Sequence, residues 1–363
     1  MSALEADVLI QGAGPAGACA ALNLAPFRRV LLLDRQPAPP RRIGESLPPA
    51  ARRLLADMGL WDDFLRQGHR PCHGNRSVWG GLAAEQDFLR DPDGHGWHLD
   101  RARFELWLRQ QAVERGAALL APASAAAVAA EDSGWRVTLR TPAGPRQVHA
   151  RVLIDAGGRA ATLARKLGAR RQPGDRLVCG WLYGHDRGEA DNGLSRIEAA
   201  EHGWWYSAAL PDRQRVLAFH TDADLAAARR LREPGWLVDA AARLPELGAL
   251  LHRTGFAAAM PAELAAAHSA RTSPAAGPGW FAVGDAALSF DPLSSQGLFN
   301  ALYTGLAAAE AADGSLNGDA AAVADYQRAL DAIGAAYRRH LDAWYGEERR
   351  WPTATFWRRR QPA

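Results

Sequence analysis

The order of apolar and polar positions at the start of the chain predicts a strand, a tight turn, a helix and a second strand. A short apolar run follows Asp7, residues 12–17 read Gly-Ala-Gly-Pro-Ala-Gly, and a second apolar run over residues 29–33 ends at Asp34. Short apolar runs bounded by glycine are typical of strands buried in a parallel sheet. Residues 1–34 are therefore predicted to form a β-α-β unit.

The same reading predicts five strands of one parallel sheet, near residues 7, 30, 118, 152 and 281. Residues 175–221 are predicted to form a second, antiparallel sheet with strands at 177–183, 196–199, 204–210 and 216–220. Apart from this sheet, residues 135–139 and 147–153 alternate like paired strands, and strand-like pieces lie at 77–80 and 86–89. Helices are expected at 48–58, at 101–115 with Asp100 as the N-cap, across the alanine-rich residues 222–268, just after Pro292 and Ser294, and over 319–348.

These elements predict an α/β protein with two domains and a helical tail. Residues 1–174 and 271–318 are expected to form one discontinuous domain, because strands from both stretches complete the parallel sheet. Residues 175–270 are expected to form an inserted antiparallel domain, a substrate or lid domain, with residues 70–100 contributing to the substrate side. Residues 319–363 are expected to form a C-terminal helical tail with an aromatic and basic end.

Composition narrows the class of protein. The chain has 363 residues, is 48% hydrophobic and carries a net charge of only +3, which does not favour a nucleic-acid partner. Three scattered cysteines without a Cys-x-x-Cys pair favour a reducing compartment. We see no secretory signal and no apolar stretch long enough for a membrane span. The sequence therefore predicts a cytoplasmic protein.

The first glycine-rich turn carries a chemical prediction of its own. Gly12 allows a tight turn, Gly14 lets the backbone approach a pyrophosphate, and Gly17 lets the helix lie close to the strand. The free N–H groups at the start of the helix attract anions. Asp34, 20 residues after Gly14, is placed to accept hydrogen bonds from a ribose. Together, the strand, turn, helix and acid indicate a dinucleotide-binding site.

Two further glycine-rich segments lie at residues 155–158 and 284–297, and a helix with an arginine-rich start begins at Arg101. In this order the segments resemble those of flavoprotein monooxygenases of the p-hydroxybenzoate hydroxylase type. The resemblance implies a Rossmann-like FAD-binding domain of the GR2 type, with FAD as the cofactor. It implies these cofactor-binding residues: Gly12, Gly14, Pro15, Ala16, Gly17, Asp34, Arg35, Arg42, Ser46, Arg101, Asp155, Gly157, Gly284, Asp285, Pro292, Gln296, Gly297 and Leu298.

The resemblance also assigns roles to these segments. It implies that residues 12–17 hold the pyrophosphate, that Arg101 reaches the phosphate or ribose side, and that Asp285 contacts the ribityl chain. The amides of Gly297 and Leu298 would meet the N1/C2=O edge of the isoalloxazine ring. A helix N-terminus at that edge stabilises the negative charge of reduced flavin.

The segment Gly44-Glu45-Ser46-Leu47 narrows the resemblance to the flavin-dependent halogenases and their monooxygenase relatives. Halogenases carry a lysine in the stretch that corresponds to residues 67–81, whereas this stretch has none, and the only lysine of the chain is Lys166. Arg76 cannot replace a nucleophilic lysine, because a guanidinium stays protonated. Halogenation is therefore disfavoured.

Aromatic segments at residues 203–208, 290–297 and 350–359 resemble a narrower branch. These are the flavoproteins that accompany amine oxidases and dehydrogenases with tryptophan-derived quinone cofactors, and that hydroxylate tryptophan within a precursor. The resemblance implies hydroxylation of an electron-rich ring, indole or tryptophan, in a small molecule, peptide or protein, through a flavin C4a-hydroperoxide formed with O2. Since no second glycine fingerprint is present, NAD(P)H supplies electrons either directly or through a separate flavin reductase.

Aromatic and histidine side chains of the inserted sheet are the candidates for the substrate side: Trp181, Tyr183, Trp204, Trp205, Tyr206 and His220. Neighbouring side chains of a strand point to opposite faces, so only half can face a pocket, and packing in the sheet core is an equal alternative for each. The predicted catalytic set is Glu45, Ser46, Trp205, Tyr206 and His220.

Other functions stay open at this point. The spacings His69-x-x-Cys72-His73 and His95-x-x-His98 lack a matching second half, so no metal is predicted. The alternatives to a monooxygenase are a flavin-dependent halogenase, a FAD-dependent reductase of isoprenoid double bonds of the geranylgeranyl reductase kind, and a non-enzymatic flavoprotein that binds a precursor.

Overall fold

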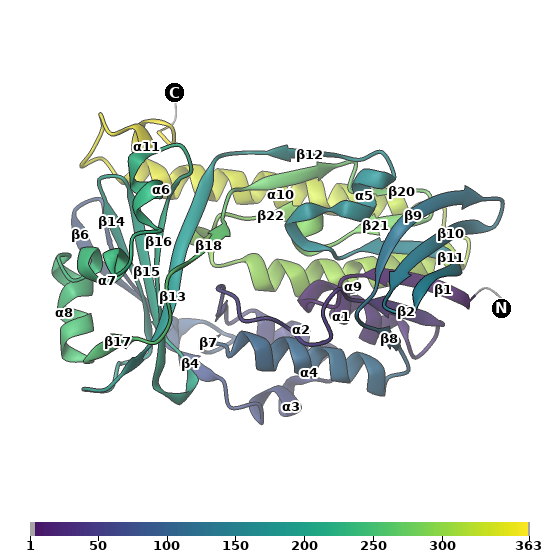
Figure 1. The fold of residues 1–363 in the computed structure, drawn as a ribbon, viewed down its shortest axis with the longest axis horizontal. Coiled ribbons are helices and arrows are strands. Elements are labelled where there is room, and N and C mark those ends of the chain that lie inside the picture. Colours follow the sequence, from purple (N-terminus) through teal and green to yellow (C-terminus); the bar gives the residue numbers. More distant parts are fainter. Residues whose placement is uncertain (1–3, 362–363) are drawn as a thin grey trace.

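The computed structural model describes residues 4–361 and contains the parallel sheet that the sequence predicts (Figure 1). Its strands are β1 (Leu4–Gln11), β2 (Val30–Leu33), β8 (Ala118–Leu120), β11 (Gly144–Asp155), β20 (Ala276–Gly277) and β21 (Trp280–Ala282). The order is β20-β21-β11-β1-β2-β8, and only the β20–β21 pair is antiparallel. Antiparallel β9 (Ser124–Glu131) and β10 (Gly134–Thr141) extend the sheet from β11. The predicted assembly of five parallel strands is confirmed.

Small residues let the helices of this half pack closely. The helices are α1 (Pro15–Leu24), α2 (Ala51–Asp57), α3 (Trp61–Leu65), α4 (Arg101–Glu114), α5 (Thr162–Lys166) and α9 (Gly297–Leu316). Helix α1 packs against both α4 and α9. A side chain at Gly305 of α9 would collide with the main-chain oxygen of Ala16, so the two helices meet backbone to backbone. Asp100 caps α4 by accepting a 3.0 Å hydrogen bond from the Arg103 amide, as predicted.

The second sheet stands at the other end of the molecule (Figure 1). Its strands are β5 (Gly74–Trp79), β6 (Leu82–Asp87), β13 (Leu177–Asp186), β14 (Leu194–Ala200), β15 (Gly203–Ala209), β16 (Gln214–Asp222), β17 (Phe256–Ala258) and β18 (Glu263–Ala266). The order is β17-β13-β16-β15-β14-β5-β6, with β18 also paired to β13. All pairs are antiparallel except β14–β5. Strands β5 and β6 thus join the sheet from the range 70–100.

Three short helices cover the outer face of this sheet: α6 (Ala226–Arg230), α7 (Trp236–Ala241) and α8 (Pro245–Arg253). The prediction of helix across residues 222–268 is wrong beyond Arg253, where β17 and β18 form instead. Pro261 separates these two strands and cannot sit inside a helix without breaking it. Pairing with β13 then outweighs the helix propensity of the alanines.

Two small sheets and a long helix join the halves. The strands are β3 (Ser46–Leu47), β4 (Arg70–Cys72) and β7 (Gly96–His98) in the first, and β12 (Arg170–Pro173), β19 (Ala270–Ser273) and β22 (Leu288–Ser289) in the second. Helix α10 (Ala322–Glu347) runs from the parallel sheet towards the second sheet, where α11 (Thr355–Arg358) ends the described chain (Figure 1). No helix within residues 4–361 has the length and apolar character that crossing a bilayer demands.

The two faces of the second sheet belong to different cores. Trp181, Tyr183 and Trp204 lie on the inner face, in one cluster with Tyr345 and Trp357 from the C-terminal region. The outer face packs on α6 to α8 in a separate cluster. Side chains that alternate along one strand are therefore sorted between these two cores.

Candidate functional site

The first glycine turn joins β1 to α1 and leaves an open cradle. A side chain at Gly17 would collide with the carbonyl oxygen of Gly12, and one at Gly12 would collide with that of Ala156. An added side chain at Gly14, by contrast, meets no atom within 4 Å. The turn is therefore packed tightly at Gly12 and Gly17 and open at Gly14, just before α1. A pyrophosphate fits such a cradle.

Asp34, at the end of β2, ties this turn in place. Its Oδ2 accepts hydrogen bonds from the Ala13 amide at 2.8 Å and from Arg109 Nη2 at 3.0 Å, and its Oδ1 accepts one from the Gln36 amide at 2.8 Å. The buried Arg109 also donates to the Ala13 carbonyl at 2.8 Å. Sequence reasoning missed Arg109, because nothing in the spacing of α4 marks one of its arginines as facing inwards. A ribose contact by Asp34, beside the exposed Arg35, stays a prediction.

Asp155, at the end of β11, serves the fold. Its Oδ1 accepts a hydrogen bond from the Gly157 amide, and its Oδ2 accepts from the amides of Leu163 and Ala164, each at 2.8 Å. The residue is 1% exposed, and burial raises the pKa of its carboxyl although three N–H groups oppose that shift. The carboxylate of Asp155 is enclosed at the start of α5, and cofactor binding by this residue stays a prediction. The role of Gly157 stays a prediction.

The late Gly-Asp segment packs against the helix that follows the first glycine turn. Gly284 has a φ of +53° and packs on Ala16 of α1 and Ala301 of α9. Asp285 follows in the 3-10 turn Gly284–Ala286, and its side chain is 39% exposed. Its Oδ2 lies 3.5 Å from Arg159 Nε. An open carboxylate there suits hydrogen bonding to the hydroxyls of a ribityl chain.

The N-terminus of α9 is also open. Gln296 and Gly297 are exposed, Leu298 is buried, and an added side chain at Gly297 would meet no atom within 4 Å. The amides of the first helical turn have no acceptor within their own helix, so they are available to an electronegative edge. Exposed Pro292 starts the 3-10 turn Pro292–Ser294 just before this helix. The residues here fit the pyrimidine edge of a flavin.

Arg101, at the start of α4, supplies a donor without a hydrogen-bond partner. Its guanidinium donates to the Gly44 carbonyl at 2.5 Å and pairs with the buried Glu105 at 2.5 Å. Its Nε is buried and has no hydrogen-bond partner among the described residues. Exposed Arg42 lies 3.8 Å from the same Glu105. An unpaired buried donor is costly, so a phosphate or ribose oxygen of FAD would satisfy this group.

Glu45 and Ser46 come from the loop that leads into β3. Glu45 is 1% exposed; its Oε2 accepts from the Gly44 amide at 3.0 Å, and its Oε1 lies 2.5 Å from the Tyr183 hydroxyl. Burial raises the pKa of Glu45, and the Tyr183 contact opposes that shift less strongly. Ser46 pairs with His98 of β7 through the backbone. Its cofactor-binding and catalytic roles stay predictions.

A pocket of about 140 Å³ opens where the start of α4 meets the second sheet. Tyr183 forms part of its wall, and the Tyr183 hydroxyl contacts the Glu45 carboxyl behind that wall. The lining residues are Arg41, Arg42, Leu99, Asp100, Arg101, Ala102, Tyr183, Leu210, Pro211 and Gln214. Arg41 lies over the Tyr183 ring, with its guanidinium carbon 5.7 Å from the ring centre.

The structure separates the aromatic residues that the sequence grouped together. Trp205 packs on Phe219 and Trp236, with ring centres 4.6 and 5.9 Å away, in the cluster of the outer face. Strand alternation thus turns Trp205 away from the inner face, and its catalytic role stays a prediction. Tyr206 points inwards and is partly exposed, and its hydroxyl has no hydrogen-bond partner within residues 4–361. Its catalytic role stays a prediction.

His220 is enclosed on the inner face. Its ring stacks on Trp204 with ring centres 3.7 Å apart, and it is 1% exposed. Burial lowers the pKa of His220 to about 3, so the imidazole is neutral at physiological pH. The pocket lining does not include it. A catalytic role for His220 stays a prediction.

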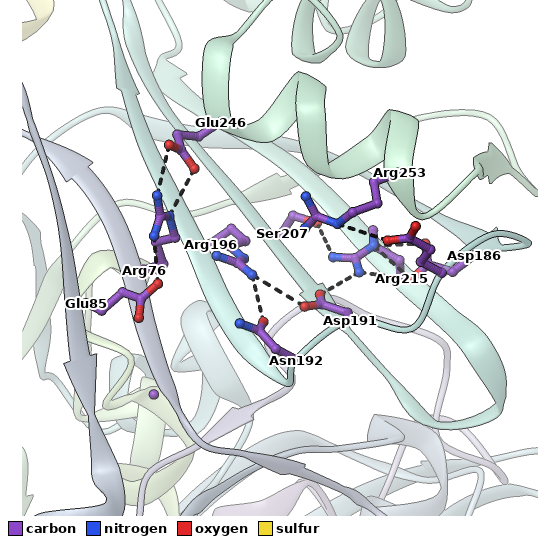
Figure 2. Close-up of polar contacts among 12 residues, drawn as sticks. Arg76, Glu85, Asp186, Asp191, Asn192, Arg196, Ser207, Arg215, Glu246 and Arg253 are labelled. Carbon is purple, nitrogen blue, oxygen red and sulfur yellow. Dashed lines mark hydrogen bonds and ion pairs between the residues drawn. The ribbon is translucent and has the colours of Figure 1, made fainter.

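A buried charge cluster fixes the connection between β13 and β14 (Figure 2). Arg215 is fully buried and pairs with Asp186 at 2.9 Å and with Asp191 at 2.6 Å. Burial alone would raise the pKa of Asp191, but the charge and hydrogen bond of Arg215 outweigh it and the pKa is lowered. Arg76, nearer the surface, pairs with Glu85 and Glu246 at 2.7 and 2.9 Å. These contacts hold the sheet together and do not reach the pocket.

Two remaining groups of residues bear on function. Within residues 4–361, no cluster of three or more His, Cys, Asp or Glu side chains could hold a metal ion. His98, for example, contacts Ser195, with its Nε2 2.8 Å from the serine hydroxyl oxygen.

Lys166, at the end of α5, donates to the carbonyl oxygens of Ala125 and Ala126 on β9. The only lysine of the chain therefore lies on the parallel-sheet half, away from the pocket lining.

Comparison with known proteins points to FAD as the cofactor of this family. A family profile described as FAD binding domain matches residues 5–188. A putative FAD-dependent oxidoreductase, LodB of Marinomonas mediterranea, is 32% identical over 362 residues, covering 98% of this chain and 96% of LodB.

Solved structures share the fold. The myxobacterial chondrochloren halogenase CndH superposes with a TM-score of 0.91 at 24% identity, over 99% of this chain and 86% of CndH. The peptidyl tryptophan dihydroxylase QhpG, essential for tryptophylquinone cofactor biogenesis, superposes with a TM-score of 0.78 at 24% identity, over 98% of this chain and 78% of QhpG. At this identity the likeness to CndH and QhpG concerns the fold alone.

Proposed function

Because the chain belongs to the FAD binding domain family and is a FAD-dependent oxidoreductase by its relatives, we propose that it is a monooxygenase that hydroxylates the indole ring of tryptophan. We further propose that this tryptophan is presented on a peptide or protein. The likeness of fold to a peptidyl tryptophan dihydroxylase supports the reaction class. The likeness to a halogenase makes halogenation the competing reaction.

The observation that carries the proposal is the pocket beside Tyr183. Its volume of about 140 Å³ is small compared with the several hundred Å³ of pockets that take drug-sized molecules. It suits one aromatic side chain whose backbone stays outside. Leu210 and Pro211 offer apolar wall, while Tyr183 offers a hydroxyl to a polar edge of the ring.

The hydrogen bonds of Tyr183 support proton donation at this pocket. Its hydroxyl lies 2.5 Å from Glu45 Oε1 and 2.9 Å from the Arg42 carbonyl oxygen. A hydroxyl has one proton, so both contacts are satisfied when the Glu45 carboxyl is protonated and donates to Tyr183, which donates to Arg42. Burial raises the pKa of Glu45 and so favours that protonated form. Tyr183 is then the group that touches the substrate, and Glu45 acts through it.

The position of Lys166 supports hydroxylation over halogenation. The halogenase resemblance requires an amine close to the substrate, and the ammonium group of Lys166 is bound to carbonyl oxygens of β9. The pocket lining contains arginines and no lysine. An arginine keeps its proton and cannot act as a nucleophilic amine.

FAD, when bound along Gly14, Arg101 and Gly297, would supply the electrons that activate O2. The protein residues would hold its phosphates, stabilise the reduced ring at the start of α9 and donate the proton of Tyr183, which the protonated Glu45 carboxyl would replace with its own. We propose NAD(P)H as the electron source, used directly or through a separate flavin reductase.

Mass spectrometry of a tryptophan peptide tests the proposal. The full chain, loaded with FAD, is incubated in air with NADPH or with NADH and a flavin reductase, and with a peptide that contains one tryptophan. We expect the peptide to gain one or two oxygen atoms, both with and without added bromide. The same peptide with phenylalanine in place of tryptophan should stay unchanged.

Two results would overturn the proposal. A brominated product that depends on bromide would identify a halogenase. Oxidation of free tryptophan with no oxidation of the peptide would show that the substrate is a small molecule.

A further inference from the structure

Helix α10 holds Asp291 from two sides. The Asp291 amide donates to the Tyr337 hydroxyl at 2.7 Å, and the Tyr345 hydroxyl donates to Asp291 Oδ2 at 2.7 Å. The two tyrosines are eight residues apart on one face of the helix. Phe290 stacks on Tyr337 with ring centres 4.2 Å apart. The chain is therefore fixed where it enters the segment that leads to α9.

Asp291 in turn shapes that segment, residues 291–296, which we call the flavin loop. Its Oδ1 accepts from the Leu293 amide at 2.9 Å, and its carbonyl oxygen accepts from the Ser294 hydroxyl at 2.8 Å. Ser295 has a φ of +52°, an uncommon conformation for a residue other than glycine. The loop ends at the open N-terminus of α9. The direction in which Gly297 presents its amide thus depends on Asp291.

Tyr345 also connects the flavin loop to the second sheet. Its hydroxyl oxygen accepts a 3.1 Å hydrogen bond from Trp204 Nε1, and Trp204 stacks on His220 of β16. Tyr345, Trp204 and Asp291 are each 2% exposed or less. One buried hydroxyl therefore joins a carboxylate on the flavin side to an indole on the sheet side.

The C-terminal segment, residues 349–361, packs directly on Tyr345. Phe356 and Trp357 are fully buried, with ring centres 6.3 and 6.1 Å from that of Tyr345. The Arg360 guanidinium lies 5.1 Å from the Tyr345 ring centre and pairs with Asp222 of β16 at 2.6 Å. Figure 1 shows this segment at the end of α10, beside the second sheet.

We propose that Tyr345 is a positioning residue for the flavin loop, and that through it the docking of the C-terminal segment and the binding of FAD strengthen each other. This inference goes beyond the proposed substrate and depends only on FAD binding. A coupling of this kind is reciprocal: the docked segment raises the affinity for FAD, and bound FAD holds the segment in place by the same factor.

Substitution of tyrosines on α10 tests the first half of the proposal. Tyr345→Phe removes only the hydroxyl, and Tyr326→Phe removes an equally buried hydroxyl whose acceptor is Ala282 of the parallel sheet. FAD affinity is measured by titration of the apoprotein, with visible circular dichroism as a signature of the bound ring. We expect Tyr345→Phe to weaken FAD binding about tenfold and to alter that signature. Tyr326→Phe should do neither, even if it lowers the melting temperature.

Substitution of arginines in the C-terminal segment tests the second half. Arg360→Gln removes the contacts with Asp222 and Tyr345, whereas Arg358→Gln changes an exposed side chain in the same segment. We expect only Arg360→Gln to weaken FAD binding. Trypsin cleavage at the arginines of the segment should be slowed by FAD in the unmodified protein and in Arg358→Gln, but not in Tyr345→Phe.

The proposal is overturned if Tyr345→Phe and Arg360→Gln both bind FAD as the unmodified protein does. It is also overturned if FAD leaves the rate of trypsin cleavage unchanged. Neither assay uses a substrate, so a failure here is distinct from a failure of the peptide oxidation experiment.

Discussion

The parallel-sheet half and the second-sheet half differ in the side chains at the contacts that shape their sites. In the parallel-sheet half, α1 and α9 meet through Ala16 and Gly305, where no larger residue fits. In the second-sheet half, the inner face is filled by Trp204 and Trp357, and buried Arg215 binds two aspartates. Small residues bring backbone amides close to a ligand, whereas large and charged ones fill space and fix loops. Main-chain geometry therefore shapes the candidate FAD cradle, and side-chain contacts shape the proposed substrate side.

The strongest way to break this comparison is to fill the open glycine. Gly14 has a φ of −72°, which any residue adopts, and its Cβ would point into free space. We expect Gly14→Glu to fold normally but to weaken FAD binding about 1000-fold, or about 4 kcal/mol, because a carboxylate would occupy the phosphate cradle. FAD titration and chemical denaturation of the apoprotein measure the two effects.

Gly17→Ala is the matched control, since it sits in the same turn on the packed side. It should lower the free energy of unfolding of the apoprotein. If both variants unfold alike, the distinction between the open and packed glycines is wrong.

The corresponding break in the second sheet is Arg215→Met. Removal of this buried guanidinium leaves the Asp186 carboxylate without its ion pair and Asp191 with only Arg196, 3.5 Å away, and we expect the free energy of unfolding to fall by about 3 kcal/mol. Arg76→Met removes two partly exposed ion pairs, with Glu85 and Glu246, and should cost less, about 1 kcal/mol. Urea denaturation of both variants measures the difference. Equal losses would show that burial of the cluster contributes nothing.

A smaller effect is expected from Glu45→Gln, which keeps the shape of the side chain and removes its proton chemistry. We expect turnover of the tryptophan peptide to fall about 100-fold, or about 2.7 kcal/mol, with unchanged FAD affinity. The unmodified enzyme should lose activity as the pH rises and Glu45 gives up its proton, since burial raises the pKa of this carboxyl. The activity of Glu45→Gln should not show this fall with rising pH.

Glu198→Gln provides the matched control for this carboxyl. Glu198 is also buried and burial raises its pKa, but its Oε2 accepts from the Leu247 amide at the start of α8. It should keep turnover and the pH profile. A loss of activity in Glu198→Gln equal to that in Glu45→Gln would contradict the role given to Glu45.

The smallest predicted effect is the pH dependence of stability that Asp291 causes where the two halves meet. Burial raises the pKa of Asp291 to about 6, although hydrogen bonds from the Leu293 amide and Tyr345 and the charge of Arg360 oppose the shift; Asp175 adds to it. The folded state thus binds the proton more tightly than the unfolded chain, so stability is lost as the pH rises. Relative to Asp291→Asn, the apoprotein should lose about 2 kcal/mol of unfolding free energy between about pH 4 and about pH 7.

Denaturation of both proteins at several pH values measures this difference. A difference that stays constant with pH would show that Asp291 does not titrate in the folded protein in this range.

The sequence predicts the parallel-sheet half well because its information is local. The glycine turn at residues 12–17, the N-cap Asp100 and the strand ends each depend on neighbours a few residues away. Asp155 shows the limit of such reasoning, since an acid after a strand serves a helix start as readily as a cofactor.

The second-sheet half could not be predicted to the same depth. Alternation shows that Trp204 and Trp205 face opposite ways, but not which face lies inside, and that depends on α7 and on the C-terminal segment. Strands β17 and β18 likewise form where a distant edge of β13 accepts them. The contact of Tyr345 with Asp291 joins residues 54 positions apart and leaves no mark in the sequence.

Lys166 has a practical consequence. It is exposed at the end of α5, and it is the only side chain of the whole sequence with a primary amine. Among the side chains of this sequence, an acylating dye or an activated resin would therefore react at a single place. A fluorophore attached there would report on the rotation of the molecule, and a resin would hold every copy by the same residue, which does not line the pocket beside Tyr183.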